Sequence, residues 1–430
     1  MHPGPGRPRG SRKSLAVAVL LAIALGLGAG VLLVRPDVEE PAAATPTVKS
    51  SRPLTPFEQA QTVLEKQAAA YLKGDEKGWL AAVDSTLTTK YRMIYRNLRG
   101  LEVSHVEYHT YPAETKAADG AVNIDADLAY CFSGAACPEW RSSADDGPPR
   151  EFQTVTLTLR DGRYVITKFV GGNTDQYLSP TPWESQTLTI AKGKRVIVAA
   201  PKSQAKNVKT VLRQAELAAA VADRYAGYID NRQKAKYRVY LADEKAWKTW
   251  YGGFDADWAI GYTVPLNAAG SDVLLHSSEV LGSTRQLRVI VQHELAHVAT
   301  LAGLTQRDTG DDQWLIEGIA EYIGAYPRQP QATGNHDVLA ESFSKRGAPK
   351  TIAVPSLADD ADDLTVNTLY AMGHYAAACM ADKYGERKLL TFTALVLREA
   401  KKPDEASRSA FGKPFSTVDK GCLTWIKARV

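Results

Sequence analysis

Two histidines and a glutamate in the segment His293-Glu294-Leu295-Ala296-His297 have the types and spacing that metal chemistry needs. Residues four apart lie on one face of a helix, so the imidazoles of His293 and His297 would converge on one point. Glu294 lies about 100° round the same helix, where its carboxylate could address a water bound at that point. The spacing predicts a zinc site, Zn²⁺ being the expected cofactor, with Glu294 as the general base.

A third ligand is expected from a second apolar helix further along the chain. A catalytic zinc takes three protein ligands and leaves one position to water, and two histidines with one glutamate form a known set. Glu317 supplies the glutamate, and Glu321, four residues later on the same face, could accept the outward N–H of a ligand histidine. The alternative for both glutamates is a solvated helix face, which their apolar neighbours Trp314, Leu315 and Ile319 disfavour.

At these motifs the chain resembles the gluzincin metallopeptidases, which include thermolysin and the zinc aminopeptidases. Their pattern is H-E-x-x-H, a loop, and then a helix similar to W-L-x-E-G-x-A. The matching residues are His293, Glu294, His297, Trp314, Leu315, Glu317, Gly318 and Ala320. The resemblance covers residues 186–430 and implies a thermolysin-like α+β domain that hydrolyses peptide bonds with a zinc-activated water.

The resemblance also implies a residue that stabilises the oxyanion. In the aminopeptidase branch a Tyr-x-x-Gly segment at the head of a later helix carries this phenol, and Tyr370 with Gly373 looks like that element. A phenol suits the task because it donates a hydrogen bond to developing negative charge. Tyr375 or His374 is an alternative for the role, and plain helix packing is another.

The expected substrate is an extended peptide or protein. We find no Gly-x-Met-x-Asn segment before the zinc helix, which in the aminopeptidases helps to bind a free amino terminus, so exopeptidase and endopeptidase activity both stay open. The strand-like run from Asp272 to His276 is expected to form the edge of a sheet, where a flexible polypeptide could pair with it. His276 is either a further imidazole near the site or an exposed strand residue.

Composition excludes other classes of protein. The chain has 430 residues, 44% of them hydrophobic and 23% charged, which suits two or three domains with sizeable cores. The formal net charge of +4 is accounted for by Arg7, Arg9, Arg12 and Lys13, so the rest of the chain is neutral. A neutral body argues against nucleic acid as a partner.

An uncharged apolar run at residues 14–34 is long enough to cross a bilayer as a helix. Because no small-x-small cleavage site follows it directly, we expect an uncleaved signal anchor, with a cleaved secretory signal as the alternative. The positive-inside rule keeps the basic tail, residues 1–13, in the cytoplasm. The predicted location is therefore the cell membrane, single-pass, with the catalytic domain extracytoplasmic, or secretion if the run is removed.

Four cysteines fit an oxidising compartment. Cys131 and Cys137 are six residues apart, whereas Cys379 and Cys422 both lie in the carboxy-terminal third. No C-x-x-C pair occurs, so a cysteine zinc site is not expected. One disulfide in each domain is predicted, with four buried thiols as the alternative.

Composition and periodicity divide the remaining chain. Residues 35–56 are proline-rich and predict an extended linker. Residues 57–178 change from helical periodicity to alternation at period two, with a hairpin signal at Asp161-Gly162. This order of elements resembles the cone-shaped domains similar to nuclear transport factor two, and we expect an accessory role for it. Residues 186–430, after a proline-rich junction, hold the zinc motifs.

The leading interpretation is a membrane-anchored, extracytoplasmic zinc metallopeptidase of the α+β class. One alternative is a catalytically silent binding module on a peptidase fold, against which the complete ligand set and Glu294 argue. Another is that the cone is a receptor for a small ligand or wall polymer and the zinc is structural. A structural zinc normally has four protein ligands, and only three are identified.

Overall fold

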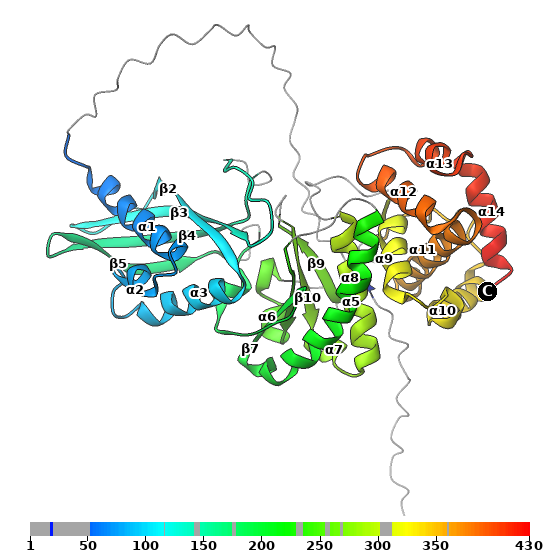
Figure 1. Cartoon of the computed structure of the whole chain (residues 1–430), viewed down its shortest axis with the longest axis horizontal. Coiled ribbons are helices and arrows are strands. Elements are labelled where there is room, and N and C mark those ends of the chain that lie inside the picture. Colours follow the sequence, from blue (N-terminus) through cyan, green and yellow to red (C-terminus); the bar gives the residue numbers. More distant parts are fainter. Residues whose placement is uncertain are drawn as a thin grey trace, which may run out of the picture.

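The computed structural model describes residues 18–19, 52–115, 117–141, 147–173, 178–228, 235–253, 259–266, 270–301, 312–358 and 361–430. Two β-sheets with helices packed against them confirm the α+β class (Figure 1). The basic tail, the expected membrane helix at residues 14–34 and nearly all of the linker lie outside the described residues, apart from the two-residue strand β1 (Ala18–Val19). No helix within the described ranges is long and apolar enough to cross a bilayer.

Three helices and a four-stranded antiparallel sheet form the amino-terminal lobe (Figure 1). The elements are α1 (Pro56–Leu72), α2 (Glu76–Leu80), α3 (Thr88–Gly100), β2 (Val103–Pro112), β3 (Ala121–Phe132), β4 (Arg150–Arg160) and β5 (Arg163–Gly171). The predicted hairpin is confirmed: Arg160 pairs with Arg163, and Asp161 and Gly162 between them both have positive φ, as a two-residue turn requires.

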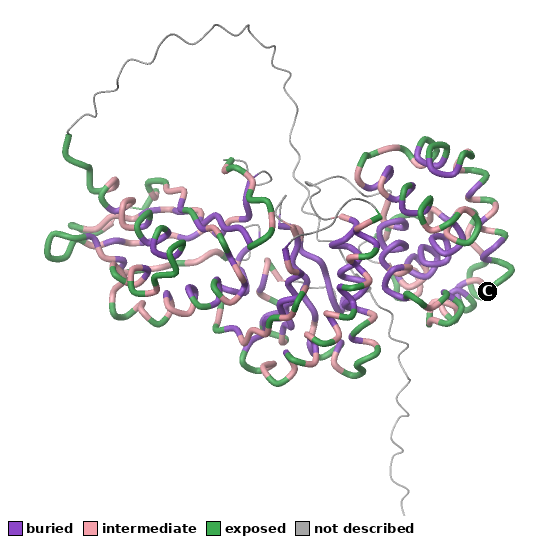
Figure 2. The backbone as a smooth tube through the Cα atoms, in the orientation of Figure 1, coloured by how far each residue is buried: buried purple, intermediate pink, exposed green. Residues whose placement is uncertain are grey.

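A six-stranded mixed sheet forms the middle of the molecule, in the order β1-β9-β10-β8-β7-β6. Its longer strands are β6 (Leu188–Lys192), β7 (Val196–Pro201), β8 (Tyr237–Ala242), β9 (Ala259–Pro265) and β10 (Ser271–His276). Val239 and Leu241 of β8 pack in one core with α5 (Val208–Tyr228) and α8 (Thr284–Leu301), whereas Tyr240 and Ala242 join the core of the amino-terminal lobe. The sheet is thus covered on both faces, and Figure 2 shows its strands as mostly buried.

The prediction that Asp272 to His276 forms a sheet edge is wrong. β10 lies inside the sheet, parallel to β8 and antiparallel to β9. Its run Val273-Leu274-Leu275 is fully buried, as expected for a strand covered on both faces rather than one half-exposed at an edge. β9 is the strand next to the edge, and only β1 lies beyond it in the described part of the sheet.

Helices form the carboxy-terminal part of the chain. They are α9 (Gln313–Ala325), α10 (Asn335–Arg346), α11 (Asp363–Tyr384), α12 (Glu386–Leu397), α13 (Pro403–Phe411) and α14 (Phe415–Lys427). The segment at Tyr370 does not head its helix as expected, because α11 begins at Asp363, where the Asp362 side chain accepts a hydrogen bond from the Thr365 amide. α11 ends at Tyr384, and Gly385 follows it with a positive φ, a conformation that favours glycine.

Both predicted disulfides are present. Cys131 is bonded to Cys137 at the end of β3, and Cys379 of α11 is bonded to Cys422 of α14. No free cysteine remains. The second bridge closes a loop of 43 residues and ties the last helix to the one that lines the site described next.

Candidate metal centre

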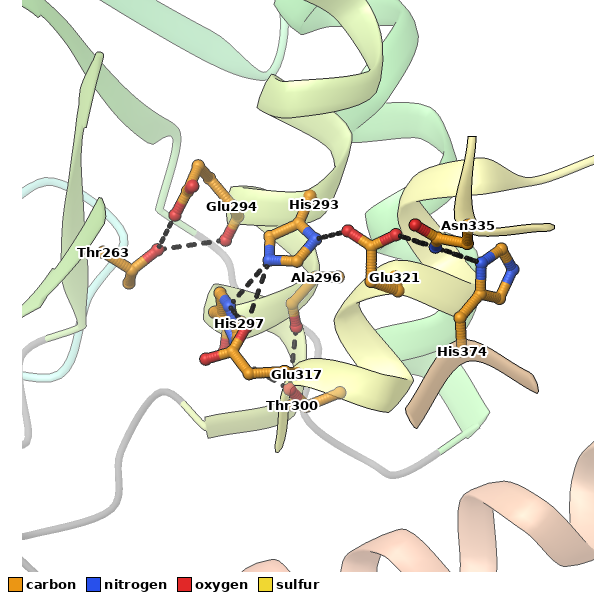
Figure 3. A network of polar contacts seen from close by, with 10 residues as sticks. All are labelled: Thr263, His293, Glu294, Ala296, His297, Thr300, Glu317, Glu321, Asn335 and His374. Carbon is orange, nitrogen blue, oxygen red and sulfur yellow. Dashed lines mark hydrogen bonds and ion pairs between the residues drawn. The ribbon is translucent and has the colours of Figure 1, made fainter. Parts of the chain in front are cut away.

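Three buried side chains from two helices converge on one point (Figure 3). His293 Nε2 lies 3.1 Å from His297 Nε2 and 3.4 Å from Glu317 Oε2, and His297 Nε2 lies 3.3 Å from the same oxygen. Zinc bonds of about 2.0–2.2 Å in tetrahedral geometry hold ligand atoms about 3.3 Å apart. Among the described residues this is the one group of three or more His, Cys, Asp or Glu close enough to hold a metal ion.

The protonation pattern of the triad also suits a cation. His293 Nδ1 lies 3.0 Å from Glu321 Oε1, which can only accept, so the proton of a neutral His293 belongs on Nδ1. Its Nε2 lone pair then faces the other two ligand atoms. Glu317 Oε2 is buried and accepts no hydrogen bond, although both imidazoles face it. Two imidazole nitrogens and one carboxylate oxygen that converge in this way are a donor set that a metal ion can bind.

Glycines bring the helices of the site close together. α9 crosses α11 where Gly318 meets Gly373: a Cβ on Gly318 would lie 2.6 Å from the Gly373 carbonyl oxygen, and a Cβ on Gly373 would lie 2.5 Å from the Trp314 carbonyl oxygen. α9 also passes α8 at Gly324, where a Cβ would lie 3.0 Å from the His293 Cβ. The glycine after Glu317 is therefore required by close backbone approach, which places the carboxylate of Glu317 against the histidines of α8.

Glu294 follows His293 on α8, and its carboxylate lies against β9. Thr263 Oγ1 donates to Glu294 Oε2 at 3.0 Å, and Glu294 Oε1 is buried without a partner. A Cβ on Gly261 would lie 2.9 Å from Glu294 Oε1, so this glycine leaves room for the carboxylate. Thr263 thus holds Glu294 Oε2, whereas Oε1 has no hydrogen-bond partner among the described residues and could accept one from a further group.

Burial and the neighbouring charges set the pKa values of the site. Burial lowers the pKa of His293, but contacts with the carboxylates of Glu317 and Glu321 outweigh it and raise the pKa to about 10. Burial lowers the pKa of His297. Burial raises the pKa of Glu294 to about 8 against the opposing effect of His293. The carboxylates therefore create a strongly negative potential at the triad, and a positive ion there would favour the ionised form of Glu294.

Behind the triad, a row of side chains continues from Glu321 (Figure 3). Asn335 Nδ2 lies 2.7 Å from Glu321 Oε2 and 2.9 Å from His374 Nδ1. His374 is fully buried, and burial lowers its pKa to about 4, so the imidazole is neutral. Glu321 therefore lies between His293 and these further polar groups.

The candidates for the oxyanion role separate in space. The Tyr370 ring lies 6.2 Å from the His293 ring between centroids. Tyr375 instead has its hydroxyl 3.2 Å from His336 Nδ1. The contacts of His276 are with other residues than the triad: its ring stacks on Trp247, and its Nε2 lies 3.1 Å from a Glu244 carboxylate oxygen.

Two polar residues of the site escaped the sequence interpretation. Thr263 lies on β9, whose alternating Ile260, Tyr262 and Val264 are a period-two signal that could have predicted the strand. Asn335 begins α10 and has no spacing relation to the zinc motifs, so nothing in the sequence indicated it.

In comparisons with known proteins, no family model and no curated protein matches the chain. What is known of the site therefore rests on the convergence of His293, His297 and Glu317 and on the groups around them.

Proposed function

We propose that the chain is a zinc-dependent metallopeptidase of the gluzincin type. The observation that carries the proposal is the buried His293-His297-Glu317 triad with metal-ligand spacing and a glutamate beside it that has one oxygen free. Such a set of three ligands leaves a position for water, as catalytic zinc sites do. When bound, zinc supplies a Lewis acid and a water whose pKa is lowered to about 7.

The protein's own groups would then act as follows. Glu294 takes a proton from the attacking water at its free Oε1 and later delivers it to the leaving amine. Thr263 holds the other oxygen of that carboxylate. Tyr370, in α11 beside His293, is proposed to donate its phenol proton to the developing oxyanion.

An extended peptide is the proposed substrate, and β9 rather than β10 is the strand proposed to pair with it. β9 contacts Glu294 through Thr263, and on its outer side it is paired, in the described part of the sheet, only with the two residues of β1, which a substrate strand would have to replace. Backbone pairing with a strand places the substrate main chain, rather than one particular side chain, against the catalytic glutamate. This favours an unfolded or flexible polypeptide as substrate.

The setting that we propose is the outer face of a membrane. Two disulfides fit an oxidising compartment. The apolar run at residues 14–34 is proposed as the anchor, in which case Ala18 and Val19 cannot stay paired with β9 as strand β1. The amino-terminal lobe, proposed to be similar to nuclear transport factor two, would be an accessory domain beside the peptidase.

The test compares the full-length protein with Glu294→Gln, which keeps the size of the side chain and removes the base. We expect one zinc per chain in both proteins, and cleavage of a quenched unfolded protein that falls by about 10²- to 10⁴-fold in the variant. Zinc content is measured by elemental analysis and cleavage by fluorescence, with and without a chelator.

Glu279→Gln, which changes an exposed glutamate on the short helix α7 (Ser277–Val280), is the matched control and should cleave like the wild type. Full activity in Glu294→Gln would remove the proposed base. Zinc without cleavage by the wild type would favour a silent binding module instead, and absence of zinc would overturn the metal centre.

A further inference from the structure

Four side chains from four different helices form one continuous row of contacts (Figure 3). His293 of α8 faces Glu321 of α9, Glu321 faces Asn335 of α10, and Asn335 faces His374 of α11. The three contacts measure 3.0, 2.7 and 2.9 Å. The row therefore connects a proposed zinc ligand to a fully buried histidine that lies outside the triad.

Donor and acceptor chemistry allows one arrangement of this row. The ionised carboxylate of Glu321 only accepts, so the amide atom of Asn335 that faces it must be the nitrogen. That NH₂ group has a second hydrogen, which reaches His374 Nδ1. His374 Nδ1 must then accept, and the proton of this neutral imidazole belongs on Nε2. Each contact thus determines the orientation of the next.

We propose that Asn335 is a positioning residue of the metal centre: its amide holds the Glu321 carboxylate at its 3.0 Å contact with His293 Nδ1, with His374 as its anchor. Outer hydrogen bonds of this kind fix the ring orientation and the tautomer of a ligand histidine. The inference rests on the proposed metal centre, but not on peptidase activity.

The local fold supports a built arrangement rather than a chance contact. The backbone N–H of Asn335 donates to Thr333 Oγ1 at 3.3 Å, which fixes the start of α10. The next residue, His336, contacts the Tyr375 hydroxyl at 3.2 Å, so two successive residues of α10 meet two successive residues of α11. The first turn of α10 is thereby held at the position that Glu321 needs.

The test measures zinc affinity in the full-length protein rather than turnover. Asn335→Leu removes both donors at similar volume, and Asn335→Asp replaces them with a second carboxylate beside Glu321. For both variants we expect a zinc Kd, measured by competition with a chromophoric chelator, about 10- to 100-fold weaker than the wild type. The metal-free variants should unfold at a somewhat lower temperature than the wild type, because Glu321 and His374 lose a buried donor, so each zinc Kd is measured well below the unfolding range.

Asn207→Leu and Asn207→Asp are matched controls. Asn207 directly precedes helix α5, is half-buried, and donates its side-chain amide to the side-chain oxygen of Gln204. Both control variants should bind zinc like the wild type. The absorption spectrum of the cobalt-loaded protein gives a second readout, which should change in the Asn335 variants alone.

A zinc Kd within twofold of the wild type in a folded Asn335 variant would overturn the proposal. So would a loss of affinity that only follows a large drop in metal-free thermal stability in both variants, because that would make Asn335 a structural residue. If the wild type binds zinc but cleaves nothing, the peptidase proposal fails and the affinity comparison still decides the role of Asn335.

Discussion

At the scale of single residues, Thr263 makes the most direct contact with the proposed base. Its hydroxyl donates to Glu294 Oε2 at 3.0 Å inside a fully buried pocket. Thr263→Val keeps the shape and removes this donor. A hydrogen bond to a charged group contributes about 1.5–3 kcal/mol, so we expect turnover to fall about 10- to 100-fold. Zinc content should not change, since Thr263 contacts none of the three ligands in the described structure.

Thr263→Ser is the control for this change, because it keeps the hydroxyl and removes only a methyl group. It should retain most of the activity. Steady-state kinetics with a peptide substrate, together with elemental analysis of each variant, provide the measurement. Equal activities of the valine and serine variants would mean that the hydroxyl does not orient the glutamate.

Residue spacing predicts the part of the site that is local in sequence. His293, His297 and Glu294 follow from one helical turn, and Glu317 and Glu321 from another, because helix geometry relates these side chains directly. Thr263 and Asn335 reach the same site through tertiary packing. Small polar residues in strands and at helix starts are common, so their types give no signal until the elements are placed.

At the scale of elements, the crossing of α9 and α11 determines where Glu317 lies. Gly318→Ala would put a methyl group 2.6–2.7 Å from backbone atoms of Gly373, which cannot move without shifting a helix. Overpacking of this kind typically costs about 1–3 kcal/mol. We expect a lower thermal midpoint and a weaker zinc Kd, since the displaced residue adjoins the ligand.

Gly421→Ala supplies the comparison, because Gly421 lies within α14 and a Cβ there meets nothing within 4 Å. Alanine is a better helix former than glycine by about 1 kcal/mol, so this variant should be slightly more stable than the wild type. Thermal unfolding of both variants, followed by zinc titration, tests the contrast. If Gly318→Ala were as stable as Gly421→Ala, the helix crossing would not depend on the absence of a side chain.

Elements with a clear period were predictable, and those defined by their neighbours were not. The helix that carries His293 and His297 and the hairpin at Asp161-Gly162 show their periods in a short window. The position of β10 in its sheet cannot be predicted from such a period, because a buried apolar run fits any strand with both faces covered. The start of α11 is not predictable in this way, because its first turn, Asp363-Leu364-Thr365-Val366, alternates polar and apolar residues instead of following a helical period.

At the scale of the whole molecule, the two lobes share one core. Asn97 of α3 donates to the carbonyl oxygens of Trp183 and Gln186 at 2.8 and 2.7 Å and accepts from the Leu188 amide at 3.1 Å. Trp183 and Leu188 are buried with residues of the amino-terminal lobe and of the central sheet. Composition predicts the proline-rich junction between the lobes but cannot show that packing continues across it.

Two glutamates are buried together at this junction. Glu151 of β4 and Glu184 of α4 (Pro182–Ser185) are 1% and 3% exposed. Gly171 and Gly172 make room for them: a Cβ on Gly171 would lie 1.6 Å from Glu184 Oε1, and a Cβ on Gly172 would lie 2.3 Å from Glu151 Oε1. Burial and the neighbouring Glu184 raise the pKa of Glu151 well above its ordinary value, and burial also raises the pKa of Glu184.

The raised pKa values determine how stability depends on pH. In the unfolded chain these carboxyls ionise above about pH 4.3, whereas in the folded protein they resist ionisation. Between the unfolded and the folded pKa, the unfolded state therefore binds fewer protons than the folded state. The contribution of these protonated carboxyls to the free energy of unfolding is fully present below the unfolded pKa. It is lost as the pH rises toward the folded pKa. Glu151→Gln removes one ionisable group of the pair, so its thermal midpoint should exceed that of the wild type by an increasing amount as the pH rises above about 4.5.

Thermal unfolding of the metal-free wild type and of Glu151→Gln across this range provides the measurement, because metal-free protein separates the junction from the zinc site. Exposed Glu279→Gln should follow the wild type at every pH. A difference between Glu151→Gln and the wild type that stays constant with pH would show that the glutamine acts through packing or hydrogen bonding alone. A difference that grows as the pH rises would show that the buried carboxyls of the junction resist ionisation in the folded protein.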